Sequence, residues 1–446
     1  MGRLGLAVLV WTLASHGAAP APAETVARRV HDGLLALGAG GVPSVAYVKG
    51  AKLVVSTRVA EGRWRAVKAA AIPAGAQVMA FAIGARGPVA LVRSADARTL
   101  TLVRRRGKSW QRIRVAAGLG PGIELGWPGL ALDAGGLPAV AYTTWNSFTY
   151  DSRLLLARVD SAGRTSAKAI TFDGFPQSLV APPATPVFFG SKLHVVESYG
   201  FGTVVATLEW FPDGRTWSGW GLDVGRGEFP LGPVFAKRSS NGTLYAAWTQ
   251  SVFAFGSTPV TLAKKRGTSH SRFVLDRALA TGLVLTPSGP EVAANEWVGA
   301  GDLGLAGDGA VWAGTIVAGK ARVGIDGWLA GLARGPGGAH QLLLARTRGL
   351  QWFRSITRPA IRVNLQAARQ PNGSVRVGGR VEGAARGTVT IYRERPGAAR
   401  RAVGRAQLSR GAFSLTDAAP REPLLYRAVY ADPATGIPYA ALLAPR

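Results

Sequence analysis

The chain has 446 residues, no cysteine, and a formal net charge of +28 from 53 lysines and arginines against 25 aspartates and glutamates. The lack of cysteine excludes disulfides, thiolate metal sites, a cysteine nucleophile and a lipid-modified cysteine. With 59 glycines and only 17% charged residues, the composition is typical of many short strands joined by tight turns.

The first 23 residues have the pattern of a secretory signal peptide. Arg3 precedes an apolar run over residues 4–14, and Ala21-Pro22-Ala23 is a small-residue cleavage pattern before Glu24. The run is too short to span a bilayer, and no later stretch approaches that length. We therefore expect residues 1–23 to be removed, leaving a secreted or envelope-associated protein without a transmembrane segment.

After the signal peptide, a turn glycine followed by a short apolar strand recurs along the chain. Successive glycines are 46, 49, 54, 52, 47 and 49 residues apart. They are Gly41, Gly87, Gly136, Gly190, Gly242, Gly289 and, more weakly, Gly338. This interval accommodates a four-stranded blade with its turns. Residues 24–357 are therefore predicted to form an all-β domain, a β-propeller of about seven blades.

A second marker keeps step with the first: an apolar strand that ends at a turn glycine, often followed by tryptophan, as in Gly107 and Trp110. The second unit shows the four expected strands most plainly. They are Val78–Ile83, Pro88–Val92, Leu100–Arg105 and Trp110–Val115.

The last unit is short, as if one strand were missing. We expect residues 24–30 to supply it by pairing with the last blade, which closes the ring and removes its exposed edges. A six-bladed ring with an irregular tail is the alternative.

Beyond residue 358 the period stops and six or seven short strands follow in under ninety residues, which predicts a β-sandwich over residues 358–446. Through residues 387–393, 411–416 and 426–430, this part resembles the Ig-like modules appended to secreted bacterial proteins. That resemblance implies a spacer or adhesion module and brings no catalytic residues. The repeated part is similar to secreted bacterial propellers in general. Residues 211–217 (FPDGRTW) resemble a degenerate Asp-box turn of sialidase-type propellers, but they lack the spacer between Asp213 and Gly214.

Little in the sequence points to catalysis. His31, His194, His270 and His340 are scattered, no metal-site, Gly-x-Ser-x-Gly or phosphate-loop motif is present, and we expect neither a metal nor a cofactor. Paired acids in a cleft are what a glycosidase needs. Glu197, Glu228 and Glu296 are the candidates for that role, although turn or surface acids are the simpler interpretation.

Long aromatic connections between the second and third strands of blades three to five are the more informative pattern. Because strands within a blade are antiparallel, these connections leave the ring on one face, near the central channel, where aromatic side chains stack on sugars or contact apolar groups. Packing among the loops themselves is the alternative. The candidate binding residues are Trp145, Phe148, Tyr150, Tyr199, Phe201, Trp248, Phe253, Phe255 and Trp297.

Basic clusters lie at turns between third and fourth strands, on the opposite face. They are Arg104, Arg105 and Arg106, and Lys264, Lys265 and Arg266. An anionic envelope polymer is one partner for them, and simple solvation is the alternative. Nucleic acid is not expected for an exported protein.

The sequence thus favours a non-enzymatic, exported protein that binds a carbohydrate or an extracellular protein through the aromatic face. A sialidase-like or other glycan-cleaving enzyme and a structural envelope protein are the alternatives. Fold-level analogy alone does not choose among them.

Overall fold

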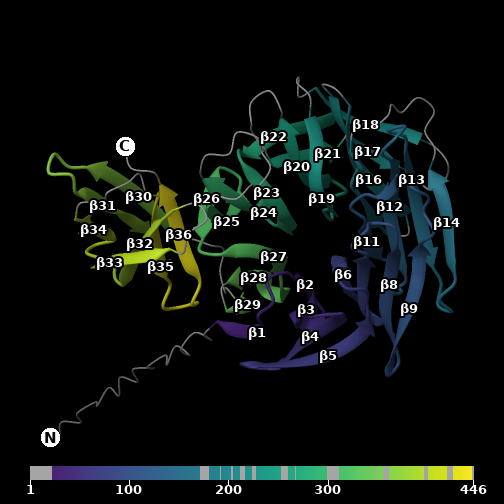
Figure 1. The fold of residues 1–446 in the computed structure, drawn as a ribbon, viewed down its shortest axis with the longest axis horizontal. Coiled ribbons are helices and arrows are strands. Elements are labelled where there is room, and N and C mark those ends of the chain that lie inside the picture. The colour runs from purple at the N-terminus through teal and green to yellow at the C-terminus, as the bar shows by residue number, and fades with distance from the viewer. Residues whose placement is uncertain are drawn as a thin grey trace, which may run out of the picture.

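The computed structural model describes residues 23–170, 180–190, 192–201, 204–210, 216–223, 228–252, 260–266, 268–298, 311–346, 348–354, 361–395, 400–418 and 425–443. Residues 1–22 of the predicted signal peptide (1–23) lie outside these ranges, as does most of the Asp-box-like turn. Apart from two short 3-10 turns at Ala39–Gly41 and Pro336–Gly338, every regular element in these ranges is a strand (Figure 1). No helix of the described part is long and apolar enough to cross a membrane.

The first three sheets in chain order use strands from the N-terminal part of the chain. Their strands are β2 (Leu34–Leu37), β3 (Pro43–Val48), β4 (Lys52–Ala60) and β5 (Arg63–Ala71); β6 (Gln77–Gly84), β7 (Gly87–Arg93), β8 (Leu100–Arg106) and β9 (Ser109–Ala116); and β10 (Ile123–Leu125), β11 (Gly129–Leu132), β12 (Pro138–Asn146), β13 (Ser152–Val159) and β14 (Thr165–Ile170).

Three further groups of four consecutive strands follow, each hydrogen-bonded in chain order. They are β15 (Ala184–Phe189), β16 (Lys192–Phe201), β17 (Val204–Trp210) and β18 (Thr216–Asp223); β19 (Glu228–Arg238), β20 (Leu244–Val252), β21 (Val260–Arg266) and β22 (Thr268–Leu275); and β23 (Ala278–Thr286), β24 (Gly289–Val298), β25 (Val311–Ala318) and β26 (Ala321–Ile325).

Another sheet combines both ends of the repeated region. It consists of β27 (Trp328–Arg334), β28 (His340–Arg346), β29 (Gly349–Arg354) and β1 (Glu24–Arg28). Each sheet from β2 to β29 is an antiparallel meander, and the strands predicted for the second unit match β6, β7, β8 and β9 to within one residue at each end.

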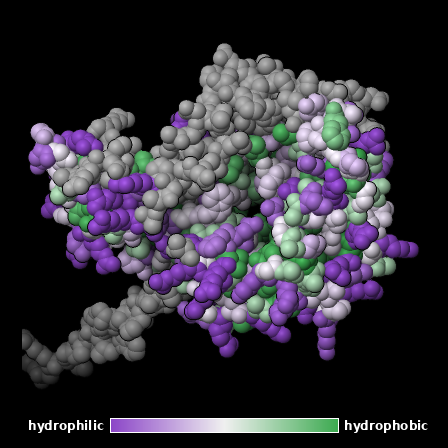
Figure 2. All heavy atoms as spheres, viewed as in Figure 1, coloured by the Kyte–Doolittle hydropathy of each residue, from purple (hydrophilic) through white to green (hydrophobic). Residues whose placement is uncertain are grey.

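The sheets are arranged radially. The innermost strand of each contacts the innermost strand of the next, in the order β2, β6, β11, β15, β19, β23 and β27, and β27 returns to contact β2. Each of these is the first strand of its meander, except β11, which follows the short strand β10. These contacts close a ring, which Figure 1 shows with the meanders arranged around it. The structure thus confirms an all-β, propeller-type fold. Figure 2 shows hydrophilic side chains projecting along the lower edge of the ring, where β5 lies.

Burial follows the place of each strand within its sheet. In β7, a second strand, the four residues from Val89 to Val92 are all buried, whereas β5, a fourth strand, is mostly exposed. Middle strands are covered by neighbouring sheets on both faces, so they need a continuous apolar run, while an outer strand faces water. The apolar runs that mark the sequence period are therefore the buried second and third strands.

Strand β1 closes the ring, as predicted from the short last unit. It pairs antiparallel with β29, and its register places Glu24 opposite Trp352 and Arg28 opposite Gly349. The backbone of β1 passes so close to Gly349 that a Cβ atom there would lie 2.1 Å from the carbonyl oxygen of Ala27. Gly349 also has a φ of 121°, which L-residues rarely adopt.

The side chain of Glu24 holds this closing strand to the first sheet. It is buried, and its two oxygens accept hydrogen bonds from Nε and Nη2 of Arg58, from the amide of Gly62 and from Nε1 of Trp64, at 2.7–3.1 Å. Burial by itself raises the pKa of Glu24, but these donors outweigh it and hold the pKa below its ordinary value.

The C-terminal residues form two further groups of strands, which we call the C-terminal sheet pair. One is β30 (Arg362–Arg369), β31 (Val375–Glu382) and β34 (Ala412–Asp417); the other is β32 (Thr388–Glu394), β33 (Arg401–Gln407), β35 (Leu425–Ala431) and β36 (Pro438–Leu443). Strand β30 contacts β35 and β36, so the two sheets pack on each other. Tyr439 of β36 also pairs with Ile325 of β26, so that β23–β26 continue through β36, β35, β32 and β33 as one eight-stranded sheet that links the pair to the ring.

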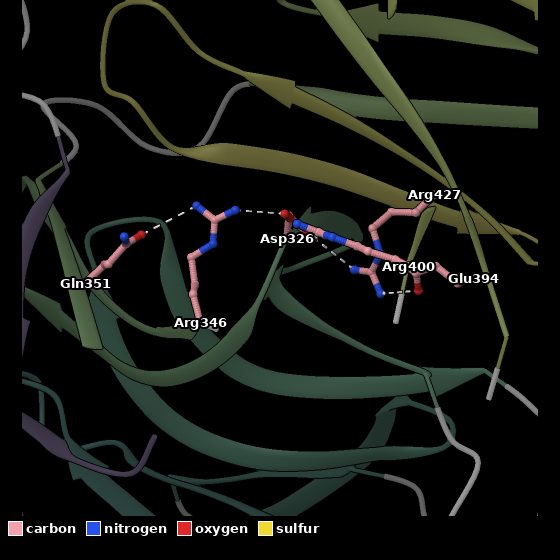
Figure 3. Close-up of polar contacts among 6 residues, drawn as sticks. All are labelled: Asp326, Arg346, Gln351, Glu394, Arg400 and Arg427. Atoms are coloured by element: carbon pink, nitrogen blue, oxygen red, sulfur yellow. Dashed lines mark hydrogen bonds and ion pairs between the residues drawn. The ribbon is translucent and has the colours of Figure 1, made fainter. Parts of the chain in front are cut away.

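A buried ion cluster holds the sheet pair against the ring (Figure 3). Asp326, in the turn between β26 and β27, is 3% exposed and lies 2.6 Å from Arg400, 3.1 Å from Arg346 and 3.4 Å from Arg427. Arg427 also makes two hydrogen bonds to Glu394, of 2.6 and 3.0 Å. Because Arg346 belongs to the ring while Arg400 and Arg427 belong to the sheet pair, one carboxylate joins the two parts.

Candidate functional site

The innermost strands of the sheets surround a central channel of about 720 Å³. Leucine, isoleucine, valine and phenylalanine side chains supply much of its wall, and among the described residues that line it the ionisable ones are Lys237, Arg238 and Arg334. Desolvation by the surrounding wall lowers the pKa of Lys237, although the residue is exposed as a whole. No carboxylate or imidazole is among these described lining residues, so they supply no acid–base pair.

The three candidate acids lie on three different sheets. Glu197 of β16 is 6% exposed. Glu296 of β24 accepts a hydrogen bond from Thr315 Oγ1 and forms an ion pair with Arg322 of the outer strand β26, both at 2.6 Å. Neither is among the channel-lining residues. Glu228 begins β19, and its side chain lies outside the described part of the chain.

Four of the candidate aromatic residues lie at or near the ends of second strands. Trp145 lies near the end of β12 and Tyr199 and Phe201 end β16, which are equivalent second strands, so these three positions leave the ring on one face. Trp297, near the end of β24, has the equivalent place. The side chains of Tyr199, Phe201 and Trp297 are not described, and Phe253 and Phe255 lie outside the described residues.

Trp248 must be removed from the binding candidates. It is 0% exposed and packs with Val196, Val234 and Leu244 in the core between two sheets. Its position inside a second strand, rather than in a connection, is the physical reason: that strand is covered on both faces.

Trp145, Phe148 and Tyr150 form a compact surface that we call the aromatic turn. Phe148 is 74% and Tyr150 is 42% exposed, and they are the two aromatic side chains among the exposed large hydrophobic residues of the described chain. The rings of Trp145 and Tyr150 are 6.3 Å apart at an interplanar angle of 49°. Such rings offer a large apolar area with little conformational entropy to lose on binding.

Hydrogen bonds keep the aromatic turn in one conformation. Asn146 Oδ1 accepts from the amide of Phe148 at 2.9 Å, and the carbonyl oxygen of Asn146 accepts from the amide of Tyr150 at 2.7 Å. Tyr150 has a φ of 61°, which costs energy for a residue with a Cβ atom. A conformation of this kind persists only where the surroundings determine it, and it is concentrated at functional sites.

Gly122 explains how the Phe148 ring lies against the backbone yet remains exposed. Its φ is 73°, and a Cβ atom there would lie 2.2 Å from the ring of Phe148. Ser147 is tied to the same point, because its amide donates to the carbonyl oxygen of Gly122 at 2.8 Å. One part of the Phe148 ring therefore rests on the backbone while the rest faces solvent.

Carboxylates stand beside these rings. Glu124 of β10 is exposed and lies directly opposite Trp145 of β12, which places the two side chains on the same face of the sheet. Asp151 is exposed next to Tyr150, and its Oδ2 accepts from Thr149 Oγ1 at 2.7 Å. Aromatic rings edged by hydrogen-bonding groups suit a ligand with both apolar faces and hydroxyls. Glu124 was not predicted from the sequence because two separate short strands, β10 and β11, pair with β12. No continuous pattern therefore shows that Glu124 lies opposite Trp145.

The basic clusters lie at turns on the opposite face from the aromatic turn, as the strand directions require. Arg104, however, is only 6% exposed and donates to Gln111 Oε1, Asp160 O and Ser161 O at 2.8–3.0 Å. It therefore holds two sheets together and is not a surface contact. Arg105, Arg106 and Lys264 are exposed, while the side chains of Lys265 and Arg266 are not described.

The histidines do not gather into a site. His194 Nε2 lies 3.2 Å from Arg238 Nη1, and His340 Nε2 lies 2.6 Å from Glu291 Oε2. Each of these two rings therefore has a polar partner inside the protein. His31 is exposed, and the side chain of His270 is not described. In the part of the chain that is described, no three histidine, aspartate or glutamate side chains come together as a metal would require.

No protein family matches the sequence, and no curated protein matches it. Among solved structures, it is similar to a protein from Lactobacillus plantarum, at 13% identity and a TM-score of 0.40, over 63% of this chain and 79% of that one. It is also similar to acylaminoacyl peptidase of Pyrococcus horikoshii, at 8% identity and 0.42, over 78% of this chain and 57% of that one. A third is xylan β-1,4-xylosidase of Bacillus halodurans, at 9% and 0.33, over 95% and 89%. None of these similarities assigns a function.

Proposed function

We propose that this is an exported, non-enzymatic binding protein: a seven-bladed propeller over residues 24–357 whose aromatic turn recognises a carbohydrate, with an Ig-like sandwich over residues 358–446 that sets its orientation. The observation that carries this proposal is the aromatic turn itself. Phe148 and Tyr150, exposed by 74% and 42%, are held in a hydrogen-bonded turn beside Glu124 and Asp151. Exposing two aromatic rings to water is unfavourable unless a ligand covers them.

Two features favour a carbohydrate over a purely apolar partner. The rings are edged by exposed carboxylates, which accept hydrogen bonds from hydroxyl groups. Sugar rings also have flat apolar faces that stack on aromatic side chains. The patch is small, whereas a stable protein interface needs a larger buried area, of about 800 Å² on each partner.

Binding is favoured over glycan cleavage because the described candidate acids are paired or buried inside the protein. Glu296 is ion-paired to an outer strand and Glu197 is buried, and the described channel wall carries cations without carboxylates. A glycosidase needs two carboxyl groups facing one scissile bond, about 5–10 Å apart.

The test is a panel of neutral and acidic oligosaccharides, with binding measured by calorimetry and new reducing ends measured on the same mixtures. We expect binding without product. Phe148→Ala and Tyr150→Ala should each weaken binding of the best oligosaccharide by about tenfold, as the loss of one stacked ring implies. Val59→Ala, at a side chain that is 56% exposed on β4, is the matched control and should leave binding unchanged. New reducing ends, or equal effects of all three substitutions, would refute the proposal.

Export through a cleaved signal peptide is part of the proposal and has its own test. Cleavage after Ala23 leaves β1 whole, because that strand begins at Glu24. Expression with residues 1–23 in a secreting bacterium should give a mature protein whose mass places Glu24 at the N-terminus. A retained leader, or a cut within β1, would contradict it.

A further inference from the structure

A second hollow, of about 540 Å³, lies on the opposite face of the ring from the aromatic turn, between the β6–β9 sheet and the β10–β14 sheet. Its lining includes Arg86, Arg104, Arg105 and Arg106, with Gly136 and Ser161 across from them. We call it the arginine hollow. No aspartate or glutamate is among its described lining residues.

Arg104 forms the floor of the arginine hollow and has a structural role there. All three of its nitrogens donate within the protein, two of them to carbonyl oxygens of the β13–β14 turn. Asp160, the acid nearest in that turn, is engaged elsewhere: its carboxylate accepts from the amides of Gly163 and Arg164 and forms a 2.7 Å ion pair with the Arg164 side chain. The carboxylate of Asp160 is thus shared with Arg164, and it offsets the positive charge of the hollow only in part.

The other arginines are oriented by single backbone contacts. Arg86 Nε donates to the carbonyl oxygen of Gly135 at 2.9 Å, and Arg105 Nε donates to that of Gly107 at 3.0 Å. Each contact uses Nε and leaves the two terminal nitrogens of the guanidinium for a ligand. Arg106 is exposed at the rim of the same hollow.

The charges in the hollow are close enough to affect one another. Burial lowers the pKa of Arg104, and repulsion from Arg106 and from Arg86 lowers it further, while Asp160 opposes these effects. Like charges held together with only one nearby acid, which is shared with Arg164, are destabilising, and a bound anion relieves that repulsion.

We propose that the arginine hollow binds a phosphate group carried by a larger ligand. Guanidinium groups match the oxygens of phosphate with paired hydrogen bonds, and three arginines around one opening suit a group with several anionic oxygens better than a single carboxylate. The hollow is open and larger than a phosphate ion, so it admits the group to which the phosphate is attached. This site is independent of the aromatic turn and of the proposed carbohydrate.

The experiment measures binding of pyrophosphate by calorimetry and binding to vesicles of phosphatidylglycerol or phosphatidylcholine by sedimentation, at near-physiological salt. The double variant Arg86→Gln/Arg106→Gln removes two cations of the hollow and keeps Arg104. Its matched control is Arg65→Gln/Arg114→Gln, which removes the same charge at exposed positions on β5 and β9 outside the hollow. Unchanged melting temperatures establish that both variants are folded.

We expect the hollow variant to weaken binding by about tenfold or more and the control by less than about twofold. Pyrophosphate binding identifies a soluble phosphate ligand, and binding to phosphatidylglycerol vesicles alone identifies a lipid headgroup; both support the site. Equal weakening in the two variants would show only general attraction to a basic protein, and it would overturn the proposal. So would failure of every probe to bind. Neither result bears on the carbohydrate test, which uses other residues.

Discussion

Asp326 and Arg400 meet across the boundary between the ring and the C-terminal sheet pair, with Oδ1 and Nη1 2.6 Å apart. Asp326 is almost fully buried, and Arg346 and Arg427 approach the same carboxylate (Figure 3). A buried charge is stable only when it is paired, so this contact sets how the sheet pair is placed against the ring.

Removing the Asp326 carboxylate should destabilise this boundary. We expect Asp326→Ala to lower the free energy of unfolding by about 3 kcal/mol, because three guanidinium groups lose their shared partner. The measurement is urea denaturation together with limited proteolysis, which should cut between the two parts sooner. Glu382→Ala is the control: its ion pair with Arg362 is exposed on both sides, so it should cost less than about 1 kcal/mol. Equal losses would show that the cluster adds nothing to the docking.

Closure of the ring depends on the close approach of β1 to Gly349. Gly349→Ala adds a methyl group that overlaps the Ala27 carbonyl oxygen, and Gly289→Ala is a matched control because Gly289 has the same φ of 121° with nothing within 4 Å. The shared φ makes its contribution to backbone strain comparable in the two variants, so most of the difference between them reports the clash. We expect Gly349→Ala to be the more destabilising by about 1–3 kcal/mol in thermal unfolding. The same loss in both variants would mean that β1 does not pass this close to Gly349.

Acid should weaken the closure through Glu24. Its folded pKa lies below the ordinary value, so its contribution to stability is complete above the unfolded pKa of about 4.3 and is lost as the pH falls through the folded pKa. Glu24→Gln should lower the free energy of unfolding by about 2 kcal/mol at pH 7 and flatten its decline between about pH 5 and pH 3. The measurement is thermal unfolding across that range. Glu382→Gln, at an exposed carboxylate, should keep the full slope.

Two aromatic substitutions separate the surface from the core. Phe148→Ser should change the free energy of unfolding by less than about 0.5 kcal/mol, because the ring is 74% exposed, while it weakens ligand binding. Trp248→Ala should cost about 3–5 kcal/mol, because it leaves a cavity in a fully buried core. Urea denaturation of both variants measures these changes in the free energy of unfolding. A large loss for Phe148→Ser would show that the aromatic turn is a structural element.

Much of the ring could be predicted because its information is local. The turn glycines and the apolar second and third strands repeat along the chain, and antiparallel pairing of neighbouring strands then follows. The shortage of one strand in the last unit even indicated that residues 24–30 would supply it, and β1 pairs with β29 as that shortage required. The C-terminal strands were also indicated by their alternation, although nothing in it showed how they contact the ring.

The individual site residues were harder to predict because side-chain direction in a strand reverses at every residue. That reversal, together with strand position, buries Trp248 and turns Arg104 into a link between two sheets, whereas both looked available in the sequence. The partners of Asp326 lie 20 to 101 residues away from it in the chain, and those of Glu24 lie 34 to 40 residues away. No local sequence pattern therefore marks these contacts. The sequence by itself determined the repeating strands and the face from which each connection leaves. Only the tertiary structure decided which side chains meet, because that depends on register and on contacts between sheets far apart in the chain.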